Sequence, residues 1–216
     1  TRHAWQLAQA RALGAQRVAV AMSCGLTQRG ALPLLPEAVR VQAALACGAD
    51  LVFALPAPCA CAGAEAFARA GVRILAAAGC DALVFGAENP DTALLQKAAR
   101  VLCSEAYRTA LKQQLAAGAR SFAAARQAAV QAVGADPAMA ALLSQPNNNL
   151  AVEYCRAILE QRAGIDPGAA APQGGQPRAD AGGERPRAIC QCQRSAGSLG
   201  RGWSRGRGPV CAGKGV

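Results

Sequence analysis

The chain has few aromatic residues, a single histidine and no long apolar run. Of its 216 residues, four are Phe, two Trp, two Tyr and one His, whereas Ala occurs 55 times. A β-sandwich or barrel needs more aromatic and β-branched side chains than this, and Ala is the strongest helix former, so an all-β fold is not expected. No apolar run reaches the roughly 20 residues that cross a bilayer, and no secretory signal is visible. We therefore expect no membrane contact and a cytoplasmic location.

The ten cysteines lack the spacing of a zinc site or of a disulfide framework. Cys59 and Cys61 are two positions apart, as are Cys190 and Cys192, and neither pair has the two-residue gap or the neighbouring His that is typical of zinc. Disulfide frameworks belong to small secreted domains, and this chain is long and shows no secretory signal. We therefore predict reduced, mostly buried thiols and no metal site.

The net charge of +10 is concentrated at the end of the chain. Residues 1–166 hold 15 Lys and Arg against 11 Asp and Glu, whereas residues 167–216 hold 8 against 2. The same final segment contains 12 of the 23 Gly and 5 of the 12 Pro. Such a composition lacks the apolar periodicity that builds a core. We therefore predict that residues 166–216 are disordered.

Short apolar runs alternate with helical patterns over the first 90 residues. The strand patterns are unbroken apolar runs, which suit a parallel sheet covered by helices on both faces. Glycines follow the helical patterns at the positions where helices commonly end. The predicted order is helix 3–13, strand 18–22, helix 37–47, strand 50–55, helix 63–78 and strand 81–85. This order predicts the α/β class.

Residues 91–165 show no strand pattern and are predicted to form a helical subdomain. Ala-rich helical stretches fill this range and are interrupted near Gly118, Gly134, Pro137 and Pro146. The chain is thus expected to divide into an α/β domain over residues 1–90, a helical subdomain over residues 91–165 and a tail over residues 166–216.

Candidate ligand contacts lie where the predicted strands end, because ligands of open parallel sheets bind beyond the carboxyl ends of the strands. Arg29, in a glycine-containing loop, could hold a phosphate through its guanidinium or lie solvated in that loop. Gly86 could let a nucleotide approach the backbone, although a plain turn explains it equally well. The residues alone favour a capping turn at Pro146–Asn149 over a ligand contact.

Several of these segments together resemble one family. In order and spacing, from about residue 2 to residue 160, the chain resembles the bacterial tRNA(Met) cytidine acetate ligase family of the HIGH-type nucleotidylyltransferases. The matching segments are Val20–Ser23, Thr27–Gly30, Arg40, Gly48–Val52, Leu55–Pro56, Phe85–Asn89 and Gln145–Asn148.

The resemblance implies an enzyme that activates acetate with ATP, with Mg²⁺ expected at the triphosphate. The acetyl-adenylate would then acetylate the wobble cytidine of elongator tRNA(Met). A small-molecule adenylyltransferase and a non-catalytic remnant that binds nucleotide or RNA are the alternatives. The family places a strand and the first histidine of its HxGH signature before the position of His3. The resemblance therefore implies a Rossmann-like sheet that lacks its first strand and an inactive, N-terminally truncated chain.

Five residues match functional positions of the family. His3 matches the second histidine of the HxGH signature, whose imidazole stabilises charge that develops on phosphate during adenylyl transfer. Gly86 matches a glycine whose backbone touches ATP, and Asn147 matches an asparagine that also binds it. Arg29 and Arg40 match arginines that we assign to phosphate or RNA contact.

The tail departs from the family abruptly. The family continues to a Ser-rich motif that ends in Ile-Arg or Leu-Arg, whereas this chain has Ile189–Arg201 at that place. One permitted back-translation of Ile189–Arg201, shifted by one nucleotide, encodes the expected motif. We therefore predict that the chain from about residue 167 is translated out of frame. The alternative is a genuine basic tail that binds RNA through phosphate charge.

Overall fold

The structure, a computed structural model, describes residues 2–26, 31–134, 136–170 and 188–193. In the described ranges, five strands form one parallel sheet in the order β2-β1-β5-β3-β4. The strands are β1 (Arg17–Ser23), β2 (Leu51–Leu55), β3 (Ala82–Gly86), β4 (Asp166–Ala170) and β5 (Ala188–Gln193). The predicted α/β class is confirmed.

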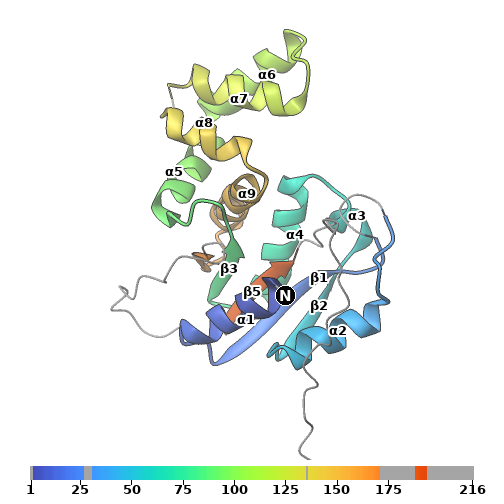
Figure 1. Cartoon of the computed structure of the whole chain (residues 1–216). Helices are drawn as coiled ribbons and strands as arrows, with labels where there is room; N and C mark the ends of the chain where they lie inside the picture. Colours follow the sequence, from blue (N-terminus) through green and yellow to red (C-terminus); the bar gives the residue numbers. More distant parts are fainter. Residues whose placement is uncertain (1, 27–30, 135, 171–187, 194–216) are drawn as a thin grey trace, which may run out of the picture.

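Helices cover both faces of this sheet, as the unbroken apolar strands predict (Figure 1). In β1, Val18, Val20 and Met22 belong to one hydrophobic core, and the intervening Ala19 and Ala21 belong to the other. The first core is closed by α1 (Arg2–Ala12) and α2 (Glu37–Ala46), and the second by α4 (Ala64–Ala77) and α9 (Pro146–Gln161). Alternation along the strand places successive side chains on opposite faces.

Glycines end the helices that lead into the strands. Gly14, Gly48 and Gly79 have φ values of 96°, 104° and 76°, a left-handed conformation that residues with a side chain rarely adopt. Each lies just after a helix, and the next strand begins within three residues. The sequence predicted these three helix ends. It did not predict the short helix α3 (Ala57–Ala60), which begins after Pro56.

Five helices occupy the second half of the described chain. The first four are α5 (Thr92–Cys103), α6 (Glu105–Ala116), α7 (Phe122–Ala132) and α8 (Pro137–Ser144), and α9 is the fifth. α9 packs against both α4 and α5, and Tyr154 of α9 stacks on Phe85 of β3 with ring centroids 5.5 Å apart. α9 therefore anchors the helical half to the sheet. The division of the chain at residues 90 and 165 stays a prediction.

Two strands correct the prediction of a wholly disordered tail. β4 and β5 lie within residues 166–216, and both pair with β3, while β5 also pairs with β1. Pro167 and Gly168 are weak strand formers, but pairing along an edge strand overrides that propensity. β5 fills the centre of the sheet between β1 and β3. The proposed change of reading frame stays a prediction.

None of the helices in these described ranges has the combination of length and apolar character that a membrane span requires.

Candidate functional site

Two of the predicted site residues, Gly86 and Asn147, lie near the carboxyl end of β3. Gly86 ends this strand and is exposed. Among the described residues, a Cβ atom added there would meet Nε2 of Gln6 alone, at 3.7 Å, so the second turn of α1 lies beside Gly86. His3 lies in the first turn of α1, about one helical turn before Gln6. The start of α1 therefore reaches the same edge of the sheet.

Glu88 connects this edge to the beginning of α9. Its Oε1 accepts hydrogen bonds from the backbone amide of Asn147 at 3.1 Å and from Asn147 Nδ2 at 2.8 Å. Its Oε2 accepts the backbone amide of Asn148 at 2.6 Å. Gln145, the residue before α9, makes no side-chain cap, so Glu88 caps the helix from 59 residues away. Because its amides are taken by a carboxylate, the start of α9 is not open to a phosphate.

Asn148 fixes the same junction from inside the protein. Its side chain is fully buried, its Oδ1 accepts the backbone amide of Asn89 at 2.8 Å, and its Nδ2 donates to Gln145 Oε1 at 2.6 Å. Asn147 is exposed, and no hydrogen bond between described residues engages its Oδ1. Asn148 is thus a structural link, whereas Asn147 presents a carbonyl oxygen as an acceptor for a ligand.

Arg40 lies at the end of a different strand, β1. Its Nη1 donates to the Ser23 carbonyl at 2.9 Å, while its Nε and the Ser23 Oγ are buried without a hydrogen-bond partner among the described residues. Nearby, burial and a hydrogen bond with Glu37 raise the pKa of the Cys24 thiol to about 11, so this thiol stays neutral and is no nucleophile. Arg40 is therefore apart from Gly86 and Asn147, because β5 separates β1 from β3.

The structure thus brings Gly86, Asn147 and the turn that carries His3 to one edge, and Arg40 to a neighbouring strand. Arg29 lies outside the described residues. Sequence reasoning missed the roles of Glu88 and Asn148, although both lie in segments that matched the family. In the parts of the chain that are described, no group of three or more His, Cys, Asp or Glu side chains is placed to hold a metal.

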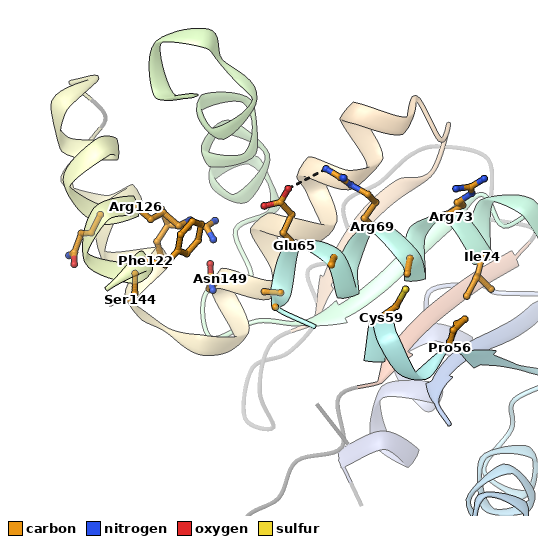
Figure 2. A pocket seen from close by; sticks show the side chains of 17 residues that line it. Pro56, Cys59, Glu65, Arg69, Arg73, Ile74, Phe122, Arg126, Ser144 and Asn149 are labelled. Carbon is orange, nitrogen blue, oxygen red and sulfur yellow. Dashed lines mark hydrogen bonds and ion pairs between the residues drawn. The ribbon is translucent and has the colours of Figure 1, made fainter. Parts of the chain in front are cut away.

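A cleft of about 960 Å³ lies on the other side of the first turn of α9 (Figure 2). α4 forms one wall of this cleft, and α7 with the start of α9 forms the other. Gly86, Asn147 and Arg40 do not line it. The residues that line it include Arg69, Arg73, Phe122, Arg126 and Asn149.

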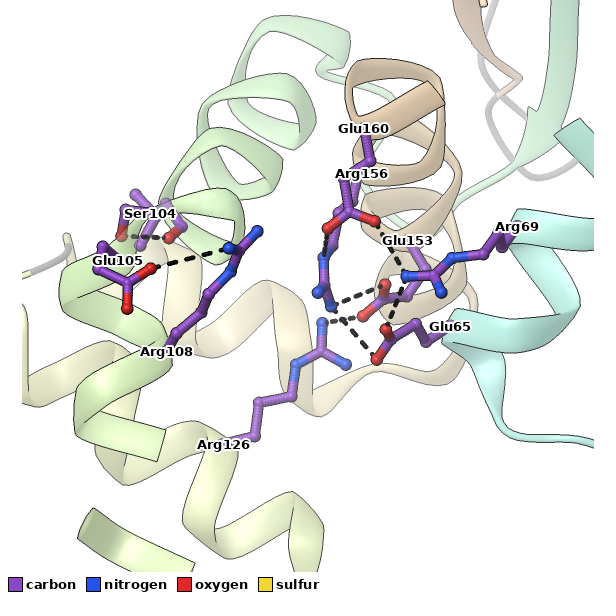
Figure 3. Close-up of polar contacts among 10 residues, drawn as sticks. Glu65, Arg69, Ser104, Glu105, Arg108, Arg126, Glu153, Arg156 and Glu160 are labelled. Carbon is purple, nitrogen blue, oxygen red and sulfur yellow. Dashed lines mark hydrogen bonds and ion pairs between the residues drawn. The ribbon is translucent and has the colours of Figure 1, made fainter. Parts of the chain in front are cut away.

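An ion-pair network ties the two walls of the cleft together (Figure 3). Glu153 of α9 is 1% exposed; its Oε1 lies 2.6 Å from Arg126 Nη2 of α7, and its Oε2 lies 3.6 Å from Arg156 Nη1. Arg156 also pairs with Glu65 of α4 at 3.3 Å. Burial raises the pKa of Glu153 despite the two guanidinium groups. The network includes Glu65, Arg69, Arg126, Glu153, Arg156 and Glu160.

Comparison with known families identifies the class of protein. The family model described as HIGH Nucleotidyl Transferase matches residues 2–176. The chain therefore belongs to the HIGH nucleotidyl transferase family.

Within that family, the chain is similar to proteins named tRNA(Met) cytidine acetate ligase. It is 39% identical to the one from Syntrophotalea carbinolica over 158 residues, which cover 72% of this chain and 38% of the relative. It is 36% identical to the one from Acetivibrio thermocellus, covering 76% of this chain and 41% of the relative. The chain thus spans about two fifths of the length of these curated relatives.

A solved structure is similar as well. The crystal structure of Thermotoga maritima TmcAL bound with alpha-thio ATP matches with a TM-score of 0.74 and 30% identity, over 82% of this chain and 44% of that one.

Proposed function

We propose that this chain carries the ATP-binding part of a tRNA(Met) cytidine acetate ligase. The observation that carries the proposal is its 30% identity and TM-score of 0.74 to a TmcAL structure bound with alpha-thio ATP. The activity of such a ligase would be formation of acetyl-adenylate from acetate and ATP, followed by acetylation of the wobble cytidine of elongator tRNA(Met). The cytoplasmic location stays a prediction.

The residues at the candidate site fit a nucleotide. Gly86 leaves the end of β3 open, since its missing side chain would meet one flexible atom at 3.7 Å. Asn147, bonded to Glu88 two residues after Gly86, offers an exposed carboxamide. At the end of β1, Arg40 Nε and Ser23 Oγ are buried polar atoms without a partner among the described residues, as expected next to a polar ligand.

The site residues would divide three roles among them. Gly86 and Asn147 would hold the nucleoside part, because the amides at the start of α9 already bind Glu88. His3 would stabilise the charge that develops on the phosphate during adenylyl transfer. Arg29 and Arg40 would contact phosphate or RNA. Mg²⁺ would arrive with the triphosphate, since this cation commonly binds through substrate phosphates, water and few carboxylates.

Substitution of Gly86 by Ala tests the nucleotide site. The new methyl group makes only ordinary contact with Gln6, so the variant should fold, yet it would fill the space that a close-approaching nucleotide needs. Gly168→Ala in the neighbouring strand β4 is the matched control, because its Cβ would also meet ordinary contacts at 3.6 and 3.7 Å. Calorimetric titration with ATP should show at least a tenfold loss of affinity for Gly86→Ala and none for Gly168→Ala. Equal affinities would contradict the site.

Exchange of labelled pyrophosphate into ATP tests the reaction. We expect little or no exchange by this chain alone, because it spans about two fifths of its relatives. In a chain extended to the length of these relatives, acetate-dependent exchange supports the ligase. Exchange that requires another small acceptor would instead support a small-molecule adenylyltransferase, and no exchange would support a binding remnant.

A further inference from the structure

The cleft between α4 and α7 has an excess of positive charge. Arg69, Arg73 and Arg126 line it, against the single carboxylate of Glu65. Arg69 and Arg126 are held in ion pairs, whereas Arg73 is exposed and has no ion pair with another described residue. An anionic ligand, such as one that carries a phosphate, would complement this wall.

The opposite wall presents an aromatic ring to the solvent. Phe122, the first residue of α7, is 56% exposed. It is the one exposed aromatic side chain in the described ranges, where Phe67, Phe85, Tyr107 and Tyr154 are buried. Figure 2 shows Phe122 next to Arg126 on one side of the cleft, with Arg69 and then Arg73 farther away along α4. An exposed ring beside arginines is the combination on which unpaired bases stack.

A polar group inside the cleft remains without a partner. Oδ1 of Asn149 is buried and accepts no hydrogen bond from another described residue. Because a carboxamide oxygen is an acceptor, it would suit a base that carries an exocyclic amino group. The volume of about 960 Å³ lies within the range of sites that enclose a nucleotide-sized ligand.

We propose that this cleft binds a short unpaired segment of an RNA, with one base on Phe122 and a phosphate of the segment at Arg73. The inference rests on the proposed function, because it assigns a place to part of the RNA substrate. Asn147 and Asn149 are two positions apart in the first turn of α9 and point about 200° apart around the helix axis. The cleft is therefore about one helix width from the nucleotide site, and the segment that it holds flanks the nucleotide that reacts.

Two pairs of variants test the cleft with fluorescein-labelled nine-nucleotide oligo(C) RNA, and a duplex RNA of equal length serves for comparison. Phe122→Leu keeps an apolar side chain and removes the ring, whereas Phe122→Tyr keeps the ring. We expect fluorescence anisotropy to show at least a fivefold weaker binding of the single strand by Phe122→Leu and less than a twofold change for Phe122→Tyr. An apolar peptide or small molecule would not distinguish leucine from tyrosine in this way.

The second pair measures the phosphate contact. Arg73→Ala should reduce the slope of log Kd against log salt by about 0.7, the value for one phosphate contact with a single strand. Arg100→Ala on α5, which removes an exposed arginine without an ion pair among the described residues, should leave the slope unchanged. ATP affinity should be unchanged in all four variants.

The proposal would be overturned by no binding of the single strand by the unaltered protein, by equal losses for both Phe122 variants, or by an unchanged slope for Arg73→Ala. Stronger binding of the duplex than of the single strand would also contradict an unpaired segment. The ATP titration decides the proposed function separately, so failure of one does not imply failure of the other.

Discussion

Replacement of Arg126 by Met should destabilise the protein strongly, because it removes the nearer partner of a buried carboxylate. Glu153 is 1% exposed. In the variant it would lose the contact with Arg126 at 2.6 Å and keep only the contact with Arg156, whose Nη1 lies 3.6 Å away. Loss of one partner from a buried ion pair costs about 3 to 5 kcal/mol. Since Arg156 still compensates part of the charge, we expect a loss of about 3 kcal/mol in the free energy of unfolding.

Urea unfolding followed by circular dichroism measures this loss. With a typical urea dependence of about 2 kcal/mol per molar, the midpoint should fall by about 1.5 M. Arg108→Met is the matched control: Arg108 pairs with Glu105 at 3.7 Å, but these side chains are 49% and 79% exposed. Such an exposed pair contributes about 0 to 1 kcal/mol.

The pH dependence separates a charge effect from a packing effect. Burial already raises the pKa of Glu153, and removal of Arg126 should raise it further. A carboxyl group whose pKa is higher in the folded state destabilises the fold as the pH rises above its unfolded value near 4.3. The penalty of Arg126→Met should therefore be smaller at pH 5 than at pH 8, and Glu153→Gln added to it should restore part of the stability. A pH-independent penalty no larger than that of Arg108→Met would refute the reasoning.

Three further predictions concern other parts of the fold. The hydrogen bond from the Val18 amide, at 2.6 Å, holds the pKa of Asp50 below its ordinary value. Asp50→Asn should therefore lose about 1.5 kcal/mol in the free energy of unfolding at pH 7, measured by urea unfolding. This difference should vanish as the pH falls below about 4 through the lowered pKa. Asn148→Ala leaves a buried amide unpaired and should lose about 2 kcal/mol in the same assay; no loss would contradict its role as a link. Burial raises the pKa of Cys155 to about 12, whereas Cys47 is exposed. Iodoacetamide labelling at pH 8 with peptide mapping should therefore modify Cys47 and spare Cys155, and rapid modification of both would contradict the packing of α9.

Local sequence patterns were sufficient to predict the first three strands, because each strand is a short apolar run that begins soon after a glycine. The expected strands at residues 18–22, 50–55 and 81–85 correspond to β1, β2 and β3 within one residue at each end. In the helical half, α6 and α7 end two residues before Gly118 and Gly134, and α8 and α9 begin at Pro137 and Pro146. The junction between α5 and α6 gave no such signal, because Ser104 caps α6 through a side-chain bond to the Tyr107 amide at 3.2 Å without glycine or proline.

Contacts between distant segments could not be predicted in the same way. β4 contains Pro167 and Gly168 and exists as a strand because it pairs with β3. At the candidate site, the family motif supplied Gly86 and Asn147, but the bonds of Glu88 to the start of α9 span 59 residues of sequence. A local pattern identifies residue types that favour a helix start or a turn; it does not state which distant carboxylate completes the cap.

The position of β5 also determines the order in which the sheet can be assembled during synthesis. β1 and β2 can pair as soon as both have left the ribosome, and β3 can pair with β4 about a hundred residues later. These two halves are joined through β5, so the inner edges of β1 and β3 stay open until residue 193 has emerged. Open strand edges are sites of mispairing, and pairing over such a long stretch of chain is slow. The centre of the finished sheet is therefore the last part that can close, and until then it is the part most exposed to mispairing.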